Sequence, residues 1–272
     1  MSKKTREFRR MESKFLVLEN SFEEIRNTLK KHIPQDIFDK TSPYTNIKTI
    51  YFDDDKFSIF QEYLSRRKFR FKVRFRNYGH HDIFKKEDFW AELKVKFRGV
   101  CFKKRFLFPY ELINDFADGK DIFYEISEIN SDTKGLKKIY KLMAKLIKIN
   151  NMKPQLITTY ERAAFQNKEK NVRITVDKNI THRSFKNPEE KKSLSPVVFE
   201  SKIGENCPQW YKELENTLSL LPQKRFSKYA TGINTTYFPL RGIYNFYTNF
   251  AETRVVSEKI EKSLILIKDK MF

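Results

Sequence analysis

The chain has 272 residues, and its 55 Lys and Arg residues exceed its 35 Asp and Glu residues by a formal net charge of +20. This surplus predicts an anionic partner, which can be a nucleic acid, an anionic membrane surface or a phosphate-rich molecule. Two cysteines without a C-x-x-C pattern argue against a disulfide framework and a thiolate zinc site, and no apolar run approaches the roughly 20 residues of a membrane span. The charged N-terminus has no apolar stretch after it, so we expect a cytoplasmic protein whose charge also permits peripheral binding at the inner face of a membrane.

Local patterns predict strands and helices that alternate along the chain. Ser21, with Glu24 three residues later, is typical of a capping box at the start of a helix. The expected elements, in chain order, are a strand at 10–18, a helix at 21–31, a strand at 47–52, a helix at 55–66, strands at 69–76, 89–98 and 100–109, helices at 111–118 and 133–150, strands at 156–166, 172–177 and 197–203, and helices at 210–221, 226–232 and 252–270. This order indicates an α+β protein, and a closed antiparallel β-barrel would remove the sheet edges.

One expected strand alternates strictly between apolar and cationic residues. In FRFKVRFRNYG (Phe69–Gly79), the odd positions are Phe or Val up to Phe75, and the even positions Arg70, Lys72, Arg74 and Arg76 are cations. Such a strand has one apolar face and one charged face. Similar alternation recurs in RMESK, WAELKVKFR, CFKKRF, NVRITVD and VFESK.

A solvated sheet face explains one such strand well, but it explains a series of cationic strands poorly. If the cationic faces point inward, they line a wet tunnel, and a bound polyanion balances their charge. The aromatic residues occupy the opposite faces, which is unlike a surface that stacks nucleic-acid bases. Internal ion pairs remain an alternative for Glu12, for Glu92 with Lys94, and for Glu200 with Lys202. The histidines His32, His80, His81 and His182 are predicted to lie on the surface.

An ordered series of short motifs spans most of the chain. The motifs are R-x-E-x-K (Arg10, Glu12, Lys14), K-x-R-x-R-x-Y-G (Lys72 to Gly79), E-x-K (Glu92, Lys94), K-x-R-F (Lys103, Arg105, Phe106), Y-x-R-x-A-F (Tyr160 to Phe165), V-R-I-x-x-D (Val172 to Asp177), E-x-K (Glu200, Lys202) and S-K-Y (Ser227 to Tyr229). Each motif is weak alone, but together and in this order they resemble the VTC domain, the polyphosphate polymerase branch of the CYTH, or triphosphate tunnel metalloenzyme, superfamily.

The resemblance implies a closed, eight-stranded antiparallel tunnel barrel with flanking helices over residues 1–240. Residues 241–272 would form an extension whose amphipathic helix packs on or beside the barrel. The implied activity is transfer of the ATP γ-phosphate onto a growing polyphosphate chain inside the tunnel, with Mn²⁺ or Mg²⁺ as cofactor.

The resemblance also assigns roles to individual residues. The implied catalytic phosphate contacts are Arg74, Arg76, Lys94, Lys103, Arg162, Arg173, Lys202 and Lys228. The implied substrate-binding residues are Arg10, Lys14, Lys72, Arg105, Ser227 and Tyr229. Glu200, assisted by Glu12, would hold the metal ion.

Two other functions remain open at this point. A tunnel triphosphatase would hydrolyse tripolyphosphate or a nucleoside triphosphate, but Arg10 replaces the first Glu of the E-x-E-x-K motif of such enzymes. The other alternative is a polyphosphate-binding protein without catalytic activity. The expected partners are ATP and inorganic polyphosphate or pyrophosphate, without nucleic acid, and a membrane-protein partner and the oligomeric state are left open.

Overall fold

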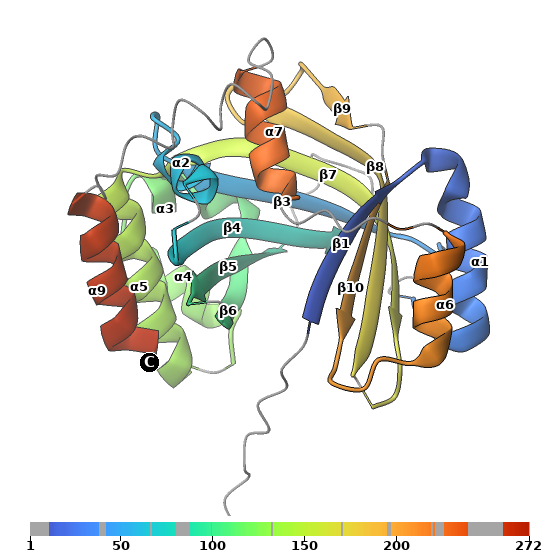
Figure 1. The fold of residues 1–272 in the computed structure, drawn as a ribbon. Helices are drawn as coiled ribbons and strands as arrows, with labels where there is room; N and C mark the ends of the chain where they lie inside the picture. The colour runs from blue at the N-terminus through green and yellow to red at the C-terminus, as the bar shows by residue number, and fades with distance from the viewer. Residues whose placement is uncertain are drawn as a thin grey trace, which may run out of the picture. The chain divides into compact units, whose positions relative to one another are not determined.

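A computed structural model describes residues 11–37, 42–65, 67–79, 88–98, 100–131, 133–169, 171–194, 197–218, 220, 226–238 and 258–271 (Figure 1). The chain divides into two compact units. Unit 1 comprises Met1–Ile47, Thr159–Thr181 and Ser193–Ser227, and unit 2 comprises Lys48–Thr158, His182–Lys192 and Lys228–Phe272. The two units are described in turn.

Unit 1 consists of antiparallel strands with two helices against one face. Its elements are β1 (Met11–Val17), the 3-10 helix η1 (Glu19–Ser21), α1 (Phe22–His32), β2 (Gln35–Asp36), parts of β7 (Lys153–Gln166), β8 (Val172–Ser184) and β9 (Lys192–Leu194), β10 (Val197–Ile203) and α6 (Gln209–Thr217). β10 pairs with β1 on one side and with β8 on the other, and Figure 1 shows α1 and α6 beside these strands. The helices bury Ile25, Leu29 and Leu214 in one cluster with Phe15 and Phe199 of the strands. The apolar strand faces are thereby covered, which leaves the polar faces for the site.

Unit 2 combines the remaining strands with the other helices. Its further elements are β3 (Thr45–Asp53, of which 48–53 belong to this unit), α2 (Ser58–Leu64), β4 (Phe69–Gly79), β5 (Asp88–Phe97), β6 (Val100–Pro109), the 3-10 helix η2 (Tyr110–Leu112), α3 (Ile113–Ala117), α4 (Phe123–Glu128), α5 (Thr133–Asn150), α7 (Lys228–Tyr237) and α9 (Glu258–Met271). β4 pairs antiparallel with β5, and β5 pairs antiparallel with β6.

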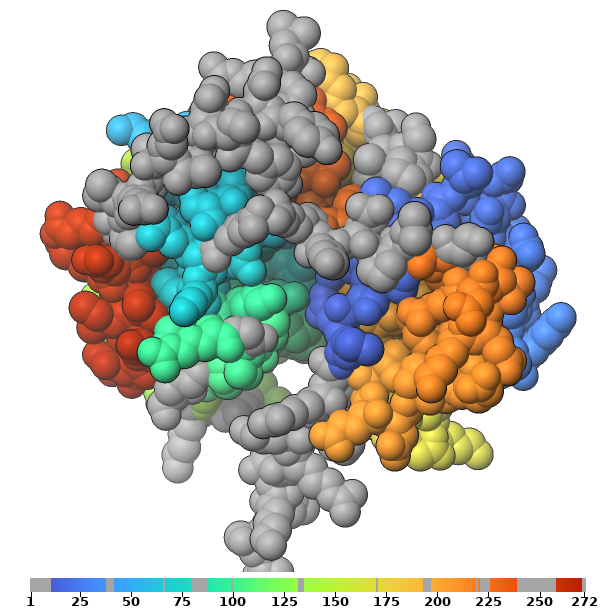
Figure 2. Space-filling view, in the orientation of Figure 1, coloured from blue at the N-terminus to red at the C-terminus, as the bar shows by residue number. Residues whose placement is uncertain are grey.

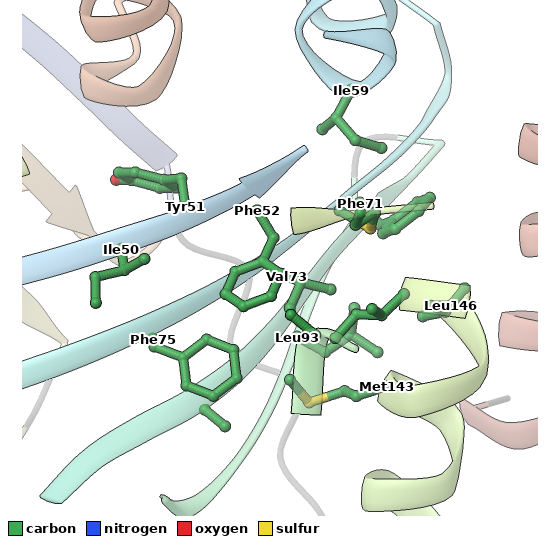
Figure 3. Close-up of a cluster of buried hydrophobic side chains, with 14 of the residues drawn as sticks. Ile50, Tyr51, Phe52, Ile59, Phe71, Val73, Phe75, Leu93, Met143 and Leu146 are labelled. Carbon is green, nitrogen blue, oxygen red and sulfur yellow. The ribbon is translucent and has the colours of Figure 1, made fainter. Parts of the chain in front are cut away.

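The core of unit 2 uses the apolar face of the alternating strand. Phe71, Val73 and Phe75 of β4 are buried together with Met143 and Leu146 of α5 (Figure 3). Burying a side chain of this size contributes about 1.5–3 kcal/mol. Because successive side chains of a strand point to opposite faces, this burial places the cations of β4 on the other face of the sheet. The predicted division of this strand into an apolar and a cationic face is confirmed.

Helix α9 is joined to the core of unit 2 and reaches its surface, where it is red in Figure 2. Ile260 and Ile267 are buried in the unit 2 cluster, whereas Ile265 is exposed. The Asn150 side-chain amide of α5 donates a hydrogen bond of 2.8 Å to the Ser263 hydroxyl of α9. This helix falls within the expected element at 252–270, of which residues 252–257 lie outside the described ranges.

Within the described ranges, the strands form one ten-stranded sheet in the order β1-β10-β8-β7-β3-β4-β5-β6, with β2 beside β7 and β9 beside β8. The antiparallel sheet with flanking helices agrees with the expected α+β class. The order has two ends, however, so over the described residues the sheet is open and is not the closed eight-stranded barrel that we expected. The alternation predicts which face of a strand is charged, but closure depends on strand tilt and shear, which alternation does not specify.

Three local predictions also change. Ser21 occupies the N-cap of α1 but makes no side-chain capping hydrogen bond. Helix α4 was not predicted. His182 is not a surface residue, because β8 continues past the expected end at residue 177 and buries this side chain to 1% exposure. Among the described helices, none has both the length and the apolar character that crossing a bilayer requires.

Candidate functional site

The polar face of β4, β5 and β6 in unit 2 carries a group of cations, here called the cationic face. The strand register brings Lys72, Lys94 and Lys103 into one row across the three strands, and the next row contains Arg74, Glu92 and Arg105. The cationic face comprises Lys72, Arg74, Arg76, Lys94, Lys103 and Arg105. Directly opposed like charges destabilise neighbouring strands, so this arrangement needs compensating negative charge.

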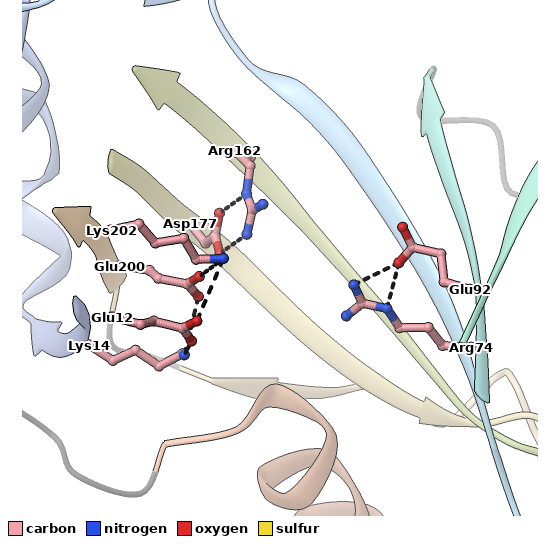
Figure 4. Close-up of polar contacts among 8 residues, drawn as sticks. All are labelled: Glu12, Lys14, Arg74, Glu92, Arg162, Asp177, Glu200 and Lys202. Atoms are coloured by element: carbon pink, nitrogen blue, oxygen red, sulfur yellow. Dashed lines mark hydrogen bonds and ion pairs between the residues drawn. The ribbon is translucent and has the colours of Figure 1, made fainter. Parts of the chain in front are cut away.

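Glu92 supplies part of that charge from the centre of the cationic face. Arg74 donates hydrogen bonds from Nε (2.8 Å) and Nη2 (2.7 Å) to Oε2 of Glu92, and Lys103 Nζ lies 3.1 Å from Oε1 (Figure 4). The Glu92 side chain is 0% exposed. Burial raises its pKa, but the charges of Arg74, Arg76 and Lys103 outweigh this effect and lower the pKa of Glu92 to about 2. Glu92 therefore stays ionised and holds the Arg74 guanidinium in one orientation.

The two remaining arginines of the cationic face are held by different contacts. Arg76 is buried, and its Nε donates a hydrogen bond of 3.1 Å to the Thr49 hydroxyl of β3. Arg105 is exposed, and its guanidinium lies 4.1 Å from the ring centroid of Trp90, a cation–π distance. The cationic face thus has a fixed part around Arg74 and Arg76 and an exposed edge at Arg105.

The S-K-Y motif meets the cationic face through Tyr229, the second residue of α7. Lys72 Nζ lies 4.8 Å from the ring centroid of Tyr229 and 5.0 Å from that of Tyr63. The Tyr229 hydroxyl donates a hydrogen bond to the carboxylate of Asp53. Lys228 is the first residue of α7, and its charge contributes to a lowered pKa of His182.

Unit 1 carries a second charged group, the carboxylate–lysine cluster, which consists of Glu12 and Lys14 of β1 with Glu200 and Lys202 of β10. The register sets Glu12 opposite Lys202 and Lys14 opposite Glu200. Lys202 Nζ lies 3.3 Å from Glu200 and 3.6 Å from Glu12, and Lys14 Nζ lies 3.5 Å from Glu200 and is hydrogen-bonded to Glu12 (Figure 4). Each ammonium group is therefore shared between two carboxylates.

The pKa values within the carboxylate–lysine cluster follow from this sharing. Burial and the Glu200 carboxylate raise the pKa of Glu12, but Lys14 and Lys202 together lower it below its ordinary value. Burial lowers the pKa of Lys14, whereas the two carboxylates raise it above its ordinary value. These opposite shifts favour the charged forms of Glu12 and Lys14.

A buried ion pair lies on the neighbouring strands of unit 1. Arg162 of β7 donates hydrogen bonds from Nε (2.6 Å) and Nη2 (2.8 Å) to the two carboxylate oxygens of Asp177 on β8 (Figure 4). Burial lowers the pKa of Arg162, but the Asp177 carboxylate raises it well above its ordinary value. Arg173 of β8 lies opposite Lys202 in the register and is exposed.

The family model of the VTC domain matches residues 9–237 of this chain. The chain belongs to the VTC domain family. It is 26% identical over 279 residues to vacuolar transporter chaperone complex subunit 4 of Schizosaccharomyces pombe, covering 85% of this chain and 38% of that protein. It is also 26% identical over 224 residues to vacuolar transporter chaperone complex subunit 4 of Trypanosoma brucei brucei, covering 70% of this chain and 28% of that protein. This chain thus spans well under half the length of these relatives.

The carboxylate–lysine cluster of this VTC domain fits the expected metal ion in its donor chemistry. Mg²⁺ in phosphate-transfer sites is bound through one or two carboxylates, phosphate oxygens and waters. Glu12 and Glu200 meet around the same ammonium groups and are partly exposed. Within the described ranges, no group of three or more His, Cys, Asp or Glu side chains is placed to hold a metal ion, so a site at this cluster would have two protein carboxylates.

The structure brings many of the predicted site residues of the VTC domain together within each unit. The cationic face gathers Lys72, Arg74, Arg76, Lys94, Lys103 and Arg105 in unit 2, and the neighbouring strands β1, β10 and β8 carry Glu12, Lys14, Glu200, Lys202 and Arg173 in unit 1. Arg162 faces Asp177, and Ser227 and Lys228 adjoin the start of α7. Arg10 lies outside the described residues.

Three carboxylates of the VTC domain make contacts with site residues that the sequence did not predict. Glu92 pairs with Arg74 and Lys103, an arrangement that the E-x-K spacing did not predict. Asp177 ends a motif that drew attention to Arg173, and its pairing with Arg162 follows from the contact between β7 and β8. Asp53 carries no motif signal, because its contact with Tyr229 is 176 positions away along the chain.

Proposed function

We propose that this VTC domain is a polyphosphate polymerase that catalyses ATP + polyP(n) → ADP + polyP(n+1). The observation that carries the proposal is the cationic face, on which buried Glu92 fixes Arg74 among several further cations. The family match and the named relatives direct this phosphate-binding chemistry toward polyphosphate rather than another polyanion.

The proposed reaction needs positioning and charge stabilisation more than acid–base chemistry. A terminal oxygen of the polyphosphate chain attacks the γ-phosphorus of ATP, and the bond from that phosphorus to the bridging β–γ oxygen breaks as ADP leaves. Neither step requires a strong general base, since the attacking oxygen is already anionic. Catalysis then depends on cations that neutralise the equatorial oxygens of the transferred phosphoryl group.

The cations divide this work according to their chemistry. Arg74, held by Glu92, presents a planar guanidinium suited to bidentate phosphate contacts, and Arg76 does the same beside Thr49. Lysines act as point charges along the chain. The proposed phosphate contacts are Arg74, Arg76, Lys94, Lys103, Arg162, Arg173, Lys202 and Lys228, with Lys14, Lys72 and Arg105 as supporting substrate contacts.

Glu200 and Glu12 would hold the Mn²⁺ or Mg²⁺ ion, whose charge would stabilise the negative charge of the phosphate groups. Lys14 and Lys202 each contact both carboxylates and so hold them close together, and their charges lower the pKa of Glu12. A tunnel around the polyphosphate chain is part of the same proposal and rests on the resemblance alone, since the described strands form an open sheet. The relatives are subunits of a vacuolar transporter chaperone complex, so we also propose a partner protein, and the cytoplasm as the place of action.

Incubation of the purified protein with ATP and Mn²⁺ tests the proposal, with polymer resolved on a gel and free phosphate measured in parallel. Lys103→Ala should lower polymer synthesis about tenfold, since it removes one phosphate contact. Its neighbour Lys104, exposed on the other face of β6, provides the matched control, and Lys104→Ala should leave synthesis unchanged. Phosphate release without polymer would replace the proposal with a triphosphatase, and binding without turnover would indicate a non-catalytic binder.

A further inference from the structure

Asp53, at the end of β3, is a fully buried carboxylate that the proposed chemistry does not use. Its Oδ1 accepts hydrogen bonds from the backbone N–H groups of Asp54 (2.8 Å) and Ile59 (3.0 Å), and its Oδ2 accepts one from Phe60 N–H (3.1 Å). The Tyr229 hydroxyl is the fourth donor, also to Oδ2. Burying a carboxylate is costly unless donors surround it, and here four donors do so.

Capping of α2 accounts for only part of this arrangement. Asp54 already caps the same helix, because its carboxylate accepts hydrogen bonds from the Ser58 N–H (2.8 Å) and the Ser58 hydroxyl (2.6 Å). Asp53 adds the contact with Tyr229, which comes from a helix far along the chain. Asp53 thus links the start of α2 to the start of α7.

Tyr229 extends this link from the core to the cationic face. Its hydroxyl is bound to Asp53, whereas its ring lies 4.8 Å from Lys72 Nζ and 5.1 Å from the centroid of Tyr51. A cation at this distance from an aromatic face is attracted to it. Tyr229 also follows Lys228 directly in α7. The residue whose ring contacts Lys72 therefore also fixes the backbone next to Lys228.

A close contact holds the same half of α7 in place. Gly232 lies so near β7 and β8 that a Cβ atom would come within 2.6 Å of both His182 Nδ1 and Leu156 Cδ2. His182 is itself fixed by Thr158, whose hydroxyl lies 3.0 Å from Nδ1. The first turns of α7 therefore have little freedom to shift.

We infer that Asp53 and Tyr229 are positioning residues, which hold Lys72 and the start of α7 with Lys228 in fixed places for phosphate binding. The inference rests on the proposed function in one respect, namely that phosphate chains are the ligand of the cationic face. It assigns Tyr229 an indirect role, because its hydroxyl is committed to Asp53. Within the S-K-Y motif, Lys228 then supplies the positive charge, and Tyr229 holds the start of α7, and with it Lys228, in place.

Tyr229→Phe tests this inference, because it removes only the hydroxyl and keeps the ring beside Lys72. The matched control is Tyr237→Phe at the other end of α7, where the hydroxyl donates a hydrogen bond to the Gln155 carbonyl (2.5 Å) and accepts one from the Ser184 hydroxyl (3.0 Å). Each variant loses the hydrogen bonds of one tyrosine hydroxyl, which is fully buried at Tyr229 and half-buried at Tyr237, so we expect both to lower the melting temperature.

The variants should differ in their affinity for inorganic tripolyphosphate, measured by isothermal titration calorimetry. Tyr229→Phe should weaken binding about fivefold, whereas Tyr237→Phe should change it less than about twofold. Amide hydrogen exchange should rise at residues 229–233 in the first variant and at residues 234–238 in the second. Equal affinities in the two variants, or an unchanged exchange pattern, would overturn the inference.

A double-mutant cycle measures the link to Lys72 directly. If Tyr229 orients Lys72, Tyr229→Leu should weaken tripolyphosphate binding in the natural background and have little further effect once Lys72→Met is present. Additive effects would overturn this part of the inference. A natural protein that binds tripolyphosphate but makes no polymer would overturn the proposed function alone, and one that does not bind tripolyphosphate would overturn both proposals.

Discussion

The cationic face of unit 2 and the carboxylate–lysine cluster of unit 1 are built from the same kinds of side chain on the same kind of alternating strand. In unit 2, a single carboxylate, Glu92, is 0% exposed and serves Arg74 and Lys103. In unit 1, Glu12 and Glu200 are 31% and 18% exposed and alternate with two lysines. The ratio of charges and the depth of burial therefore differ, although the sequence pattern is shared.

This difference separates two uses of a glutamate on a polar strand face. A buried carboxylate cannot exchange its partners cheaply, because each partner that leaves uncovers an uncompensated charge. A partly exposed carboxylate can release a lysine to water or to a phosphate at little cost. We therefore interpret Glu92 as a fixed support for arginine, and Glu12 and Glu200 as groups that can change partners when ligand binds.

The largest effect should come from Glu92→Ala, compared with Glu12→Ala in the other unit. Loss of Glu92 leaves the cations around it without their buried counter-charge, so the free energy of unfolding should fall by about 3–5 kcal/mol. Loss of Glu12 should cost about 1 kcal/mol or less, since its partners are partly exposed. Urea unfolding followed by circular dichroism measures both.

Arg74→Met in the Glu92→Ala background serves as the control. Removing the stranded guanidinium should restore part of the lost stability. If Glu12→Ala lowers the free energy of unfolding as much as Glu92→Ala does, the interpretation of Glu92 as a fixed carboxylate and Glu12 as an exchangeable one is wrong.

The second largest effect is expected from acid, which should destabilise unit 2 through His182, a residue of that unit. Burial, together with the Lys228 charge, lowers the pKa of His182 from 6.5 to about 4. The unfolded chain therefore binds a proton first, so this contribution to stability is complete above about pH 6.5 and is lost as the pH falls to about 4, a change of about 3 kcal/mol.

Urea midpoints between pH 7 and pH 4 measure this loss in the natural protein and in His182→Gln. The variant should be less stable at pH 7 but should show a flatter decline with acid. An equally steep decline in both proteins would assign the acid sensitivity to other groups.

Glu200→Gln should lower polymer synthesis about 100-fold, the usual scale for loss of one group that stabilises developing charge. Its melting temperature should stay close to that of the natural protein, because glutamine has nearly the same shape as glutamate and the side chain is partly exposed. Glu161→Gln provides the matched control, since Glu161 is a similarly exposed glutamate of unit 1, paired with Lys178 outside the cluster. A comparable loss of activity in Glu161→Gln would show that Glu200 has no special role.

The smallest effect is expected at the exposed edge of the cationic face. Arg105→Lys keeps the charge but loses the planar contact with Trp90, so tripolyphosphate binding should weaken only about twofold. Isothermal titration calorimetry is sensitive enough to measure this change. A tenfold loss would instead place Arg105 with Arg74 in the fixed part of the cationic face.

Features governed by one strand at a time were predictable from the sequence. The alternation at Phe71, Val73 and Phe75 predicted a buried face and, opposite it, the cationic face, because side-chain direction follows from a period of two. The ion pair between Glu200 and Lys202 was one of the alternatives left open, and it is present at 3.3 Å.

Features that depend on contacts between distant elements were not predictable. Glu92 pairs with Arg74 and Lys103 on the adjacent strands. The register between strands decides these pairs, and the pattern of a single strand does not reveal that register. Asp53 belongs to no motif, and its burial is explained by backbone donors at the start of α2 together with the hydroxyl of Tyr229 from a distant helix. His182 was misplaced because β8 extends beyond its apolar pattern.

The packing of α9 on α5 has a practical consequence for the limits of the domain. The family match ends at residue 237, yet Ile260 and Ile267 beyond it complete the core of unit 2. A recombinant fragment cut at the end of the match would expose the apolar surface that these side chains cover, at about 1.5–3 kcal/mol for each. A fragment that keeps this core intact therefore has to extend past residue 237, where the family match ends.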